Sequence, residues 1–367
     1  MKKIYLLLAI TIISISCNQS PKSYHISGQV TDTELNGKIV YLSRISGEEL
    51  VNVDSVMVEE GNFEFKGIQD IPAVYYLRFN DNIDIYTSFI LENAELVAVL
   101  GSESSVKGSN LNNRLQSFIK KNETFDEEMK ALEKIYLEKA ADNTLTEDIE
   151  IRLSNKYDSI NELFIEHIQN FILSNLDNVS GAFVLVRYQN LFEDKQLENI
   201  ISKSETAFQN EIGVKQIAER LRRIASVAEG KMFADMNLRL PNGTPGKLSD
   251  YAGKGKFTIV DFWASWCGPC RVALPELIDI YNEYKNKGVD VVGVSLDIDS
   301  TEWVNAIENL HIPWVQLSDL KGWDAEATKV YGVNSIPHLM LINPDGSIAA
   351  KGMNEKELRI KLQELLK

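Results

Sequence analysis

Hydrophobic positions change their spacing twice along the chain, and these changes mark three regions of different expected structure. Between residues 24 and 108, short runs alternate apolar and polar positions and are separated by polar turns such as Glu60-Gly61-Asn62. Alternation with a period of two is typical of half-buried strands, and a series of short strands predicts a sandwich or barrel. We therefore expect a small all-β, sandwich-like domain over residues 24–108.

The second region, residues 109–229, takes helical spacing instead. No proline lies between residues 110 and 226, and apolar residues recur three and four positions apart. The first such face comprises Leu111, Leu115, Phe118, Ile119, Phe125, Met129, Leu132, Ile135 and Tyr136. One apolar face per helix is the pattern of packed amphipathic helices, so residues 109–229 are predicted to form a helical segment.

The third region, residues 230–367, alternates strands with helices. Residues 257–262 and 289–296 are almost continuous apolar runs, which are typical of strands buried on both faces. Helical spacing follows them over residues 267–285 and 301–310. This alternation predicts an α/β domain with a mostly parallel sheet covered by helices on both faces.

The first 17 residues are predicted to be a targeting signal and not part of the fold. Lys2 and Lys3 precede an apolar run at residues 4–15, which is too short to span a bilayer comfortably. The run ends at Ser16-Cys17, and a small residue before a cysteine here resembles a bacterial lipoprotein signal.

That resemblance implies cleavage before Cys17 and lipidation of its sulfur, although Ser14 stands where such signals carry an aliphatic residue. The expected location is therefore the cell envelope, with a lipid anchor in the membrane. The residues after Cys17 contain no acidic run, which favours a periplasmic orientation. A soluble exported protein and an uncut membrane anchor remain open as alternatives.

Composition excludes one class of partner. Lys and Arg total 38 against 53 for Asp and Glu, and the formal net charge is −15. A surface this acidic repels phosphate backbones, so we expect no nucleic-acid partner.

The cysteines narrow the chemistry further. Besides Cys17, the chain has only Cys267 and Cys270. A structural zinc site needs four ligands, and none of the four histidines is paired with these cysteines at a metal-ligand spacing, so no metal is expected. In an exported protein a lone C-x-x-C is either a redox-active pair or an inert short-loop disulfide.

The place of the cysteine pair favours redox activity. Cys267 follows a predicted buried strand and opens a predicted helix, where free backbone N–H groups favour a thiolate. We expect Cys267 to be the more exposed sulfur and the nucleophile, and Cys270 to resolve the mixed disulfide. Gly268 and Pro269 keep the loop tight, and proline suits a first helical turn.

Residues 262–270, Phe-Trp-Ala-Ser-Trp-Cys-Gly-Pro-Cys, resemble the thioredoxin active-site motif, and residues 333–337, Val-Asn-Ser-Ile-Pro, resemble the second signature of that family. The resemblance implies a central mixed sheet flanked by helices. It also implies a cis Ile336–Pro337 bond beside the disulfide, with the Ile336 backbone receiving the substrate chain and Trp266 covering the disulfide. A strand-edge proline is the alternative for Pro337.

Asp261 matches the buried acid of the thioredoxin family, six residues before the first cysteine. A carboxyl group in an apolar strand is expected to have a raised pKa, which suits a relay for the proton of Cys270. The alternative is a strand-end acid that bonds to the backbone.

Within the superfamily, the lead-in at residues 241–251 and the insert at residues 300–320 are similar to the TlpA/ResA branch of exported reductases. Ala273 departs from this branch, which often carries a glutamate three residues after the second cysteine. Residues 24–108 are similar to a β domain that precedes thioredoxin modules in Bacteroides-type lipoproteins. Peroxidase chemistry is not expected, because the P-x-x-x-T-x-x-C motif of peroxiredoxins is missing before Cys267.

These features predict an exported reductase that acts on disulfides of envelope proteins, apocytochromes included. A membrane thiol donor is expected to reduce its disulfide again after each turnover. Its expected redox group is the Cys267–Cys270 disulfide alone, with no further cofactor. An oxidant role is a third possibility. The second function class is an envelope lipoprotein that binds a partner or ligand, with the thioredoxin-like module in a secondary or sensing role.

Overall fold

The fold is known from a computed structural model that describes three stretches of the chain, residues 21–47, 49–80 and 84–367. The predicted signal of residues 1–17, including Cys17, lies outside the described residues. The chain divides into two compact units between Gln216 and Ile217. Each unit contains its own hydrophobic core.

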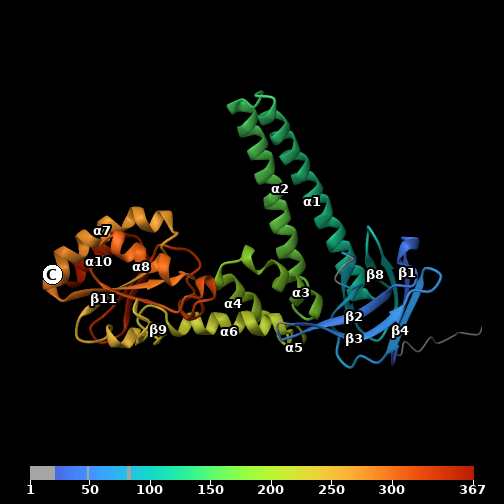
Figure 1. Ribbon diagram of the computed structural model, residues 1–367. Coiled ribbons are helices and arrows are strands. Elements are labelled where there is room, and N and C mark those ends of the chain that lie inside the picture. Colours follow the sequence, from blue (N-terminus) through green and yellow to red (C-terminus); the bar gives the residue numbers. More distant parts are fainter. Residues whose placement is uncertain (1–20, 48, 81–83) are drawn as a thin grey trace, which may run out of the picture. The chain divides into compact units, whose positions relative to one another are not determined.

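The first unit begins with two four-stranded sheets (Figure 1). Their strands are β1 (Tyr24–Val30), β2 (Ile39–Ser46), β3 (Glu49–Met57), β4 (Asn62–Gly67), β5 (Ala73–Arg78), β6 (Tyr86–Leu91), β7 (Glu95–Leu100) and β8 (Ser105–Lys107). The order is β4-β1-β7-β8 in one sheet and β3-β2-β5-β6 in the other. Side chains of both sheets, such as Ile26 and Leu42, share one buried cluster, so the sheets pack as a sandwich. The predicted all-β front region is confirmed.

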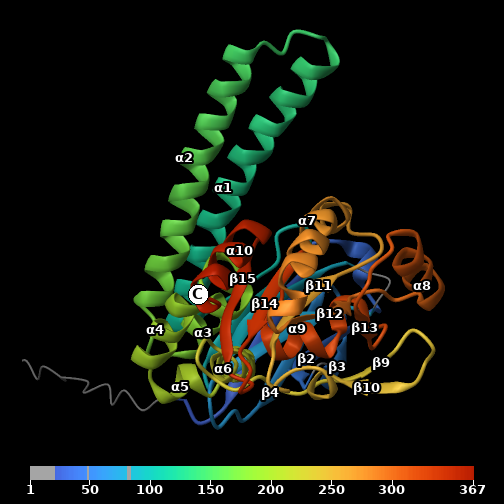
Figure 2. The same cartoon turned by 90° about the vertical axis from the view of Figure 1, so that its left-hand side faces the viewer.

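Helices follow the sandwich, as the spacing predicts. They are α1 (Asn110–Ala141), α2 (Glu147–Leu173), α3 (Val179–Tyr188), α4 (Asp194–Lys203), α5 (Thr206–Gln209) and α6 (Ile212–Ser226). Helices α1 and α2 run side by side as a long hairpin in both views (Figures 1 and 2). No helix among the described residues has both the length and the apolar composition needed to cross a membrane.

One buried side chain joins the helices to the sandwich. Asn112 in α1 accepts the Ile90 N–H through Oδ1 at 2.9 Å and donates through Nδ2 to the Ile90 carbonyl at 2.7 Å. Ile90 lies in β6, which is an edge strand of its sheet. The amide therefore satisfies backbone groups that a neighbouring strand would otherwise satisfy.

The outer part of α1 departs from the predicted apolar face. Leu115 and Leu132 are buried, but Ile135 and Tyr136 are exposed. Along the middle of the hairpin, Leu132 packs with Phe125 of its own helix and Ile160 of α2. A two-helix hairpin buries only the stripe that faces the partner helix, so apolar residues beside that stripe stay in contact with solvent.

The second unit holds a seven-stranded sheet and helices α7 to α10. Its elements are β9 (Asn237–Arg239), β10 (Pro245–Lys247), β11 (Phe257–Trp263), α7 (Gly268–Tyr284), β12 (Val289–Ser295), α8 (Ser300–Asn309), β13 (Val315–Ser318), α9 (Glu326–Tyr331), β14 (His338–Ile342), β15 (Ile348–Met353) and α10 (Glu355–Leu365). The order is β10-β9-β13-β12-β11-β14-β15.

The expectation of a mostly parallel sheet is wrong, whereas the central mixed sheet implied by the family resemblance is confirmed. Strands β11, β12 and β13 are parallel, but β14 and β15, like β9 and β10, pair antiparallel. The tight turns at residues 241–243 and 343–346 account for the β9–β10 and β14–β15 pairings, because so short a connection can join only antiparallel neighbours.

Strand β11 lies inside the sheet, between β12 and β14, and leads directly into α7. Helices α7 and α10 pack against each other, and α10 also contacts β14 and β15 (Figure 2). Asp261 and Phe262 point to opposite faces of β11, since successive side chains of a strand alternate. Phe262 contacts Tyr331 and His338 on its own face.

Candidate active site

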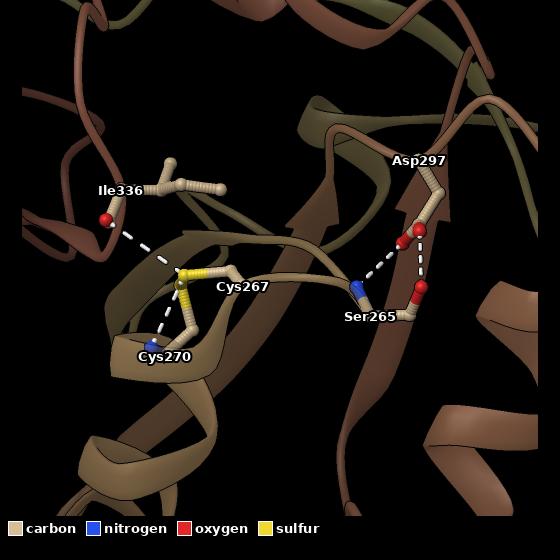
Figure 3. Close-up of a disulfide and its surroundings, with 5 residues drawn as sticks. All are labelled: Ser265, Cys267, Cys270, Asp297 and Ile336. Atoms are coloured by element: carbon tan, nitrogen blue, oxygen red, sulfur yellow. Dashed lines mark hydrogen bonds between the residues drawn. A yellow bond between two sulfur atoms is a disulfide. The ribbon is translucent and has the colours of Figure 1, made fainter.

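The two cysteines form a disulfide at the start of α7 (Figure 3). Cys267 is the N-cap residue of the helix, and its Sγ accepts the backbone N–H of Cys270 at 3.1 Å. Gly268 and Pro269 form the first helical positions, where the missing N–H of proline leaves no helix bond unmade. In the reduced protein the same N–H groups and the helix dipole would stabilise negative charge on the Cys267 sulfur.

Residue exposure does not separate the two cysteines, contrary to the expectation that Cys267 is the more exposed. The exposed fractions are 4% for Cys267 and 5% for Cys270. The two residues differ in position: Cys267 lies at the end of the helix, where N–H groups converge, and Cys270 lies within its first turn. The assignment of Cys267 as nucleophile therefore rests on the helix terminus.

The second signature lies beside the disulfide. The Ile336–Pro337 peptide bond is cis, and the Ile336 carbonyl oxygen is 3.8 Å from Cys267 Sγ (Figure 3). Trp266 is 54% exposed, and its ring centroid is 6.3 Å from that of the exposed Trp323. Trp266, which directly precedes Cys267, thus belongs to an exposed aromatic pair that a protein substrate could contact.

A buried carboxylate that sequence reasoning missed holds the loop before Cys267. Asp297, 1% exposed, accepts the Ser265 N–H at 3.0 Å and the Ser265 hydroxyl at 2.5 Å (Figure 3). The Ser295 hydroxyl donates to the same carboxylate at 2.6 Å. These bonds tie the loop after β11 to the end of β12 and fix where α7 begins. The sequence offers only a small hint, an acid directly after a predicted buried strand.

A second buried contact lies behind the loop. The Trp263 indole N–H donates to Gln316 Oε1 at 2.8 Å. The Gln316 side chain lies over Gly293 of the strand between them, where an added Cβ would come within 2.3 Å of its amide atoms. Glycine at this position therefore makes room for the side chain that holds Trp263.

Gly293→Ala is expected to destabilise the second unit by about 1–3 kcal/mol, because the new methyl group displaces the Gln316 amide and breaks its bond to Trp263. Urea unfolding followed by tryptophan fluorescence measures the change. Gly268→Ala is the matched control, since nothing lies within 4 Å of its added Cβ. Equal stability of the two variants would contradict this role of Gly293.

Asp261 lies in β11, opposite Gly293 on one side and Leu339 on the other. It is 5% exposed, and burial, with a smaller contribution from the Glu355 carboxylate, raises its pKa to about 7. A carboxyl group with this pKa can both take up and release a proton near neutral pH. Ala273, at the position where the related branch often has a glutamate, leaves no carboxyl group there.

The described residues contain no group of three or more His, Cys, Asp or Glu side chains placed to hold a metal ion. The site thus consists of a disulfide at a helix N-terminus, a cis-proline segment beside it and a buried acid in the preceding strand. This combination, on a mixed sheet flanked by helices, defines a thioredoxin-like dithiol domain.

Comparison with known proteins gives the same class. Residues 255–348 match the family described as Thioredoxin-like, and the second unit is a thioredoxin-like domain. It is similar to the thiol-disulfide oxidoreductase ResA of Oceanobacillus iheyensis, with 38% identity over 104 residues, covering 28% of this chain and 50% of that protein. ResA of Bacillus subtilis is 30% identical over 123 residues, covering 34% of this chain and 66% of the relative. The chain therefore spans about half to two thirds of the length of these relatives.

Two solved structures are also similar to the second unit. One is the C-terminal domain of a putative thiol-disulfide oxidoreductase from Bacteroides thetaiotaomicron, with 32% identity, a TM-score of 0.36, and 38% of this chain and 97% of that one covered. The other is a putative thiol:disulfide interchange protein DsbE from Chlorobium tepidum, with 29% identity, a TM-score of 0.35, and 39% and 100% covered. At the front of the chain, residues 24–115 match a domain of unknown function, DUF4369.

Proposed function

We propose that the protein reduces disulfide bonds of proteins in the cell envelope through its Cys267–Cys270 dithiol. The observation that carries the proposal is the disulfide at the N-terminus of α7, with the Ile336 carbonyl 3.8 Å from Cys267 Sγ. A sulfur at a helix end is suited to act as a thiolate, and a free backbone edge beside it is suited to receive an extended peptide.

The reaction takes place in two exchanges. The Cys267 thiolate attacks one sulfur of the substrate disulfide, the substrate S–S bond breaks, and one substrate thiolate leaves. The Cys270 thiolate then attacks Cys267 Sγ, which releases the second substrate thiolate and closes the internal disulfide. Two electrons pass to the substrate, and Asp261 takes up the proton that Cys270 loses. A membrane thiol donor must then reduce the disulfide again.

Each remaining site residue has a positional role in this proposal. Gly268 and Pro269 keep the two sulfurs close, Ile336 and Pro337 offer backbone to the substrate, and Trp266 contacts it from its exposed side. The dithiol is the whole redox group, without a further cofactor. The location is the cell envelope, through a lipid on Cys17, with the domain facing the periplasm. Apocytochromes are one substrate class that the TlpA/ResA resemblance suggests.

The reduction potential of the Cys267–Cys270 pair tests the direction. We expect a value on the order of −250 mV or lower for the purified protein, because a pair that reduces substrates must be a stronger reductant than they are. Equilibration with defined ratios of reduced to oxidised glutathione or dithiothreitol, followed by alkylation and mass spectrometry, measures it. A potential above about −150 mV would contradict a reductase and indicate an oxidant or isomerase.

A further inference from the structure

A groove in the first unit, remote in sequence from the disulfide, has features of a binding site. It has a volume of about 540 Å³ and lies between the sandwich and the helices. The start of β6 and the loop of residues 101–104 form one wall, and α1, α2 and α3 form the other. We call this the acidic groove, after the four carboxylates that line it, Asp84, Glu103, Glu123 and Asp126.

Aromatic rings form the apolar part of the acidic groove. Phe118, Phe164 and Tyr188, from three different helices, all line it. The Tyr188 ring meets both phenylalanines edge-on, with centroid distances of 6.3 Å to Phe118 and 5.8 Å to Phe164. Phe118 is buried, with the His167 ring stacked on it, and belongs to the floor of the groove. The Arg187 guanidinium lies over the Tyr188 ring, 5.8 Å from its centroid, so this part of the groove already holds a cation against an aromatic face.

The carboxylates give the groove a negative field. Four acidic residues line it against one basic residue, Arg187. Asp126 is paired with Lys130 at 2.6 Å. The side chains of Asp84, Glu103 and Glu123 form no hydrogen bond or ion pair with another described residue. Unpaired carboxylates around aromatic rings attract a cation over a distance and stabilise it once it is bound.

Asn122 gives an independent sign of a missing ligand. Its side chain lines the groove, its residue is only 9% exposed, and its Nδ2 donates to the Tyr188 hydroxyl at 3.1 Å. The amide oxygen Oδ1 is buried and has no hydrogen-bond partner among the described residues. Buried acceptors are nearly always satisfied, so an acceptor left open beside the acidic groove fits a donor that binds there.

We propose that the acidic groove binds a lysine- or arginine-containing segment of a partner protein, with the cationic group among the carboxylates and beside the aromatic rings. A groove of this volume, open between two structural layers, has room for a peptide segment and not just for one ammonium group. The site would serve to recruit a basic partner. It does not depend on the thiol chemistry of the second unit.

The test measures peptide binding by calorimetry, with the full-length chain carrying Cys267→Ser and Cys270→Ser so that no thiol exchange contributes. The probe is the capped peptide Gly-Lys-Gly-Lys-Gly at low ionic strength, and the reference is the same peptide with glutamate in place of lysine. We expect binding of one lysine peptide per chain, weakened by added salt, and no binding of the glutamate peptide.

Two double variants locate the binding. Glu103→Gln with Glu123→Gln removes two carboxylates of the groove, and the dissociation constant is expected to rise about tenfold. Glu127→Gln with Glu128→Gln is the matched control, because both residues are exposed on α1 and neither lines the groove. The control is expected to bind within about twofold of the parent.

Several outcomes would overturn the proposal. Absence of lysine-peptide binding, equal binding of the glutamate peptide, or equal weakening by both double variants would each do so, the last because it would indicate general charge attraction. If lysine amide alone bound as tightly as the peptide, the groove would hold a small amine and not a protein segment. Self-association that only the groove variant abolished would assign the groove to a second copy of this chain. Peptide binding by the serine variant, together with failure of the parent protein to reduce a disulfide substrate, would support this proposal and contradict the proposed function.

Discussion

Cys267→Ser is expected to lower the rate of disulfide reduction by roughly a thousandfold or more, and Cys270→Ser is expected to leave the protein trapped on its substrate. Cys267 is the attacking group at the helix end, so serine in its place removes the first exchange entirely. Cys270 acts only in the second exchange. Without it, the bond between Cys267 and the substrate forms but cannot be resolved within the protein.

Reduction of insulin in the presence of dithiothreitol measures the first effect. Incubation of the reduced variants with an oxidised protein, followed by alkylation and mass spectrometry, measures the second. The mixed disulfide is expected with Cys270→Ser and not with Cys267→Ser. Val272→Ser, a change at an exposed position of the same helix, is the control and is expected to keep the parent activity. Mixed disulfides that form through Cys270 alone would reverse the two roles.

The cysteine pair could be placed from the sequence because its signals are local. A buried apolar strand, a C-x-x-C with Gly268 and Pro269 between the cysteines, and a following amphipathic helix lie within thirty consecutive residues. The helix begins at Gly268, one residue after the expected start, because Cys267 is its N-cap. Asp261 is likewise visible, since a single acid in an apolar strand is conspicuous.

The contacts that hold this loop could not be predicted, because they join residues far apart in the chain. Asp297 follows β12 and reaches Ser265 across 32 positions, and Gln316 reaches Trp263 across 53. Each is an ordinary polar residue in sequence, and only the strand order of the sheet brings it to its partner. The acidic groove is hidden for the same reason, since its lining comes from one strand, two loops and three helices.

The apolar spacing of a helix also fails to predict burial where no other element packs over the helix. Ile135 and Tyr136 continue the apolar spacing of α1, yet they are exposed because α1 and α2 extend as a hairpin. A hydrophobic pattern shows which face of a helix can be buried. It does not show whether another element covers that face.

Asp261→Asn is expected to stabilise the second unit at pH 8 by roughly 4 kcal/mol more than at pH 4. Burial raises the pKa of Asp261 from 3.8 to about 7, so the folded protein holds this proton where the unfolded chain has released it. The neutral carboxyl group therefore favours folding below about pH 4, and that contribution is lost as pH rises from about 4 to 7. A difference of about three pKa units at 1.36 kcal/mol each gives the size of the effect. Asparagine never ionises and so avoids the loss.

Urea unfolding of the parent and the variant across this pH range measures the difference, and taking the difference removes the titration of all other groups. Asp279→Asn is the matched control, because Asp279 is exposed on α7, and its difference from the parent is expected to stay flat. A flat difference for Asp261→Asn as well would mean that this carboxyl group is not held neutral by burial. If Asp261 also takes up the proton of Cys270, the variant should resolve mixed disulfides more slowly while forming them at the parent rate. A variant that is more stable at pH 8 and slower only in that second exchange would show that burying the acid lowers the free energy of unfolding but assists proton transfer from Cys270.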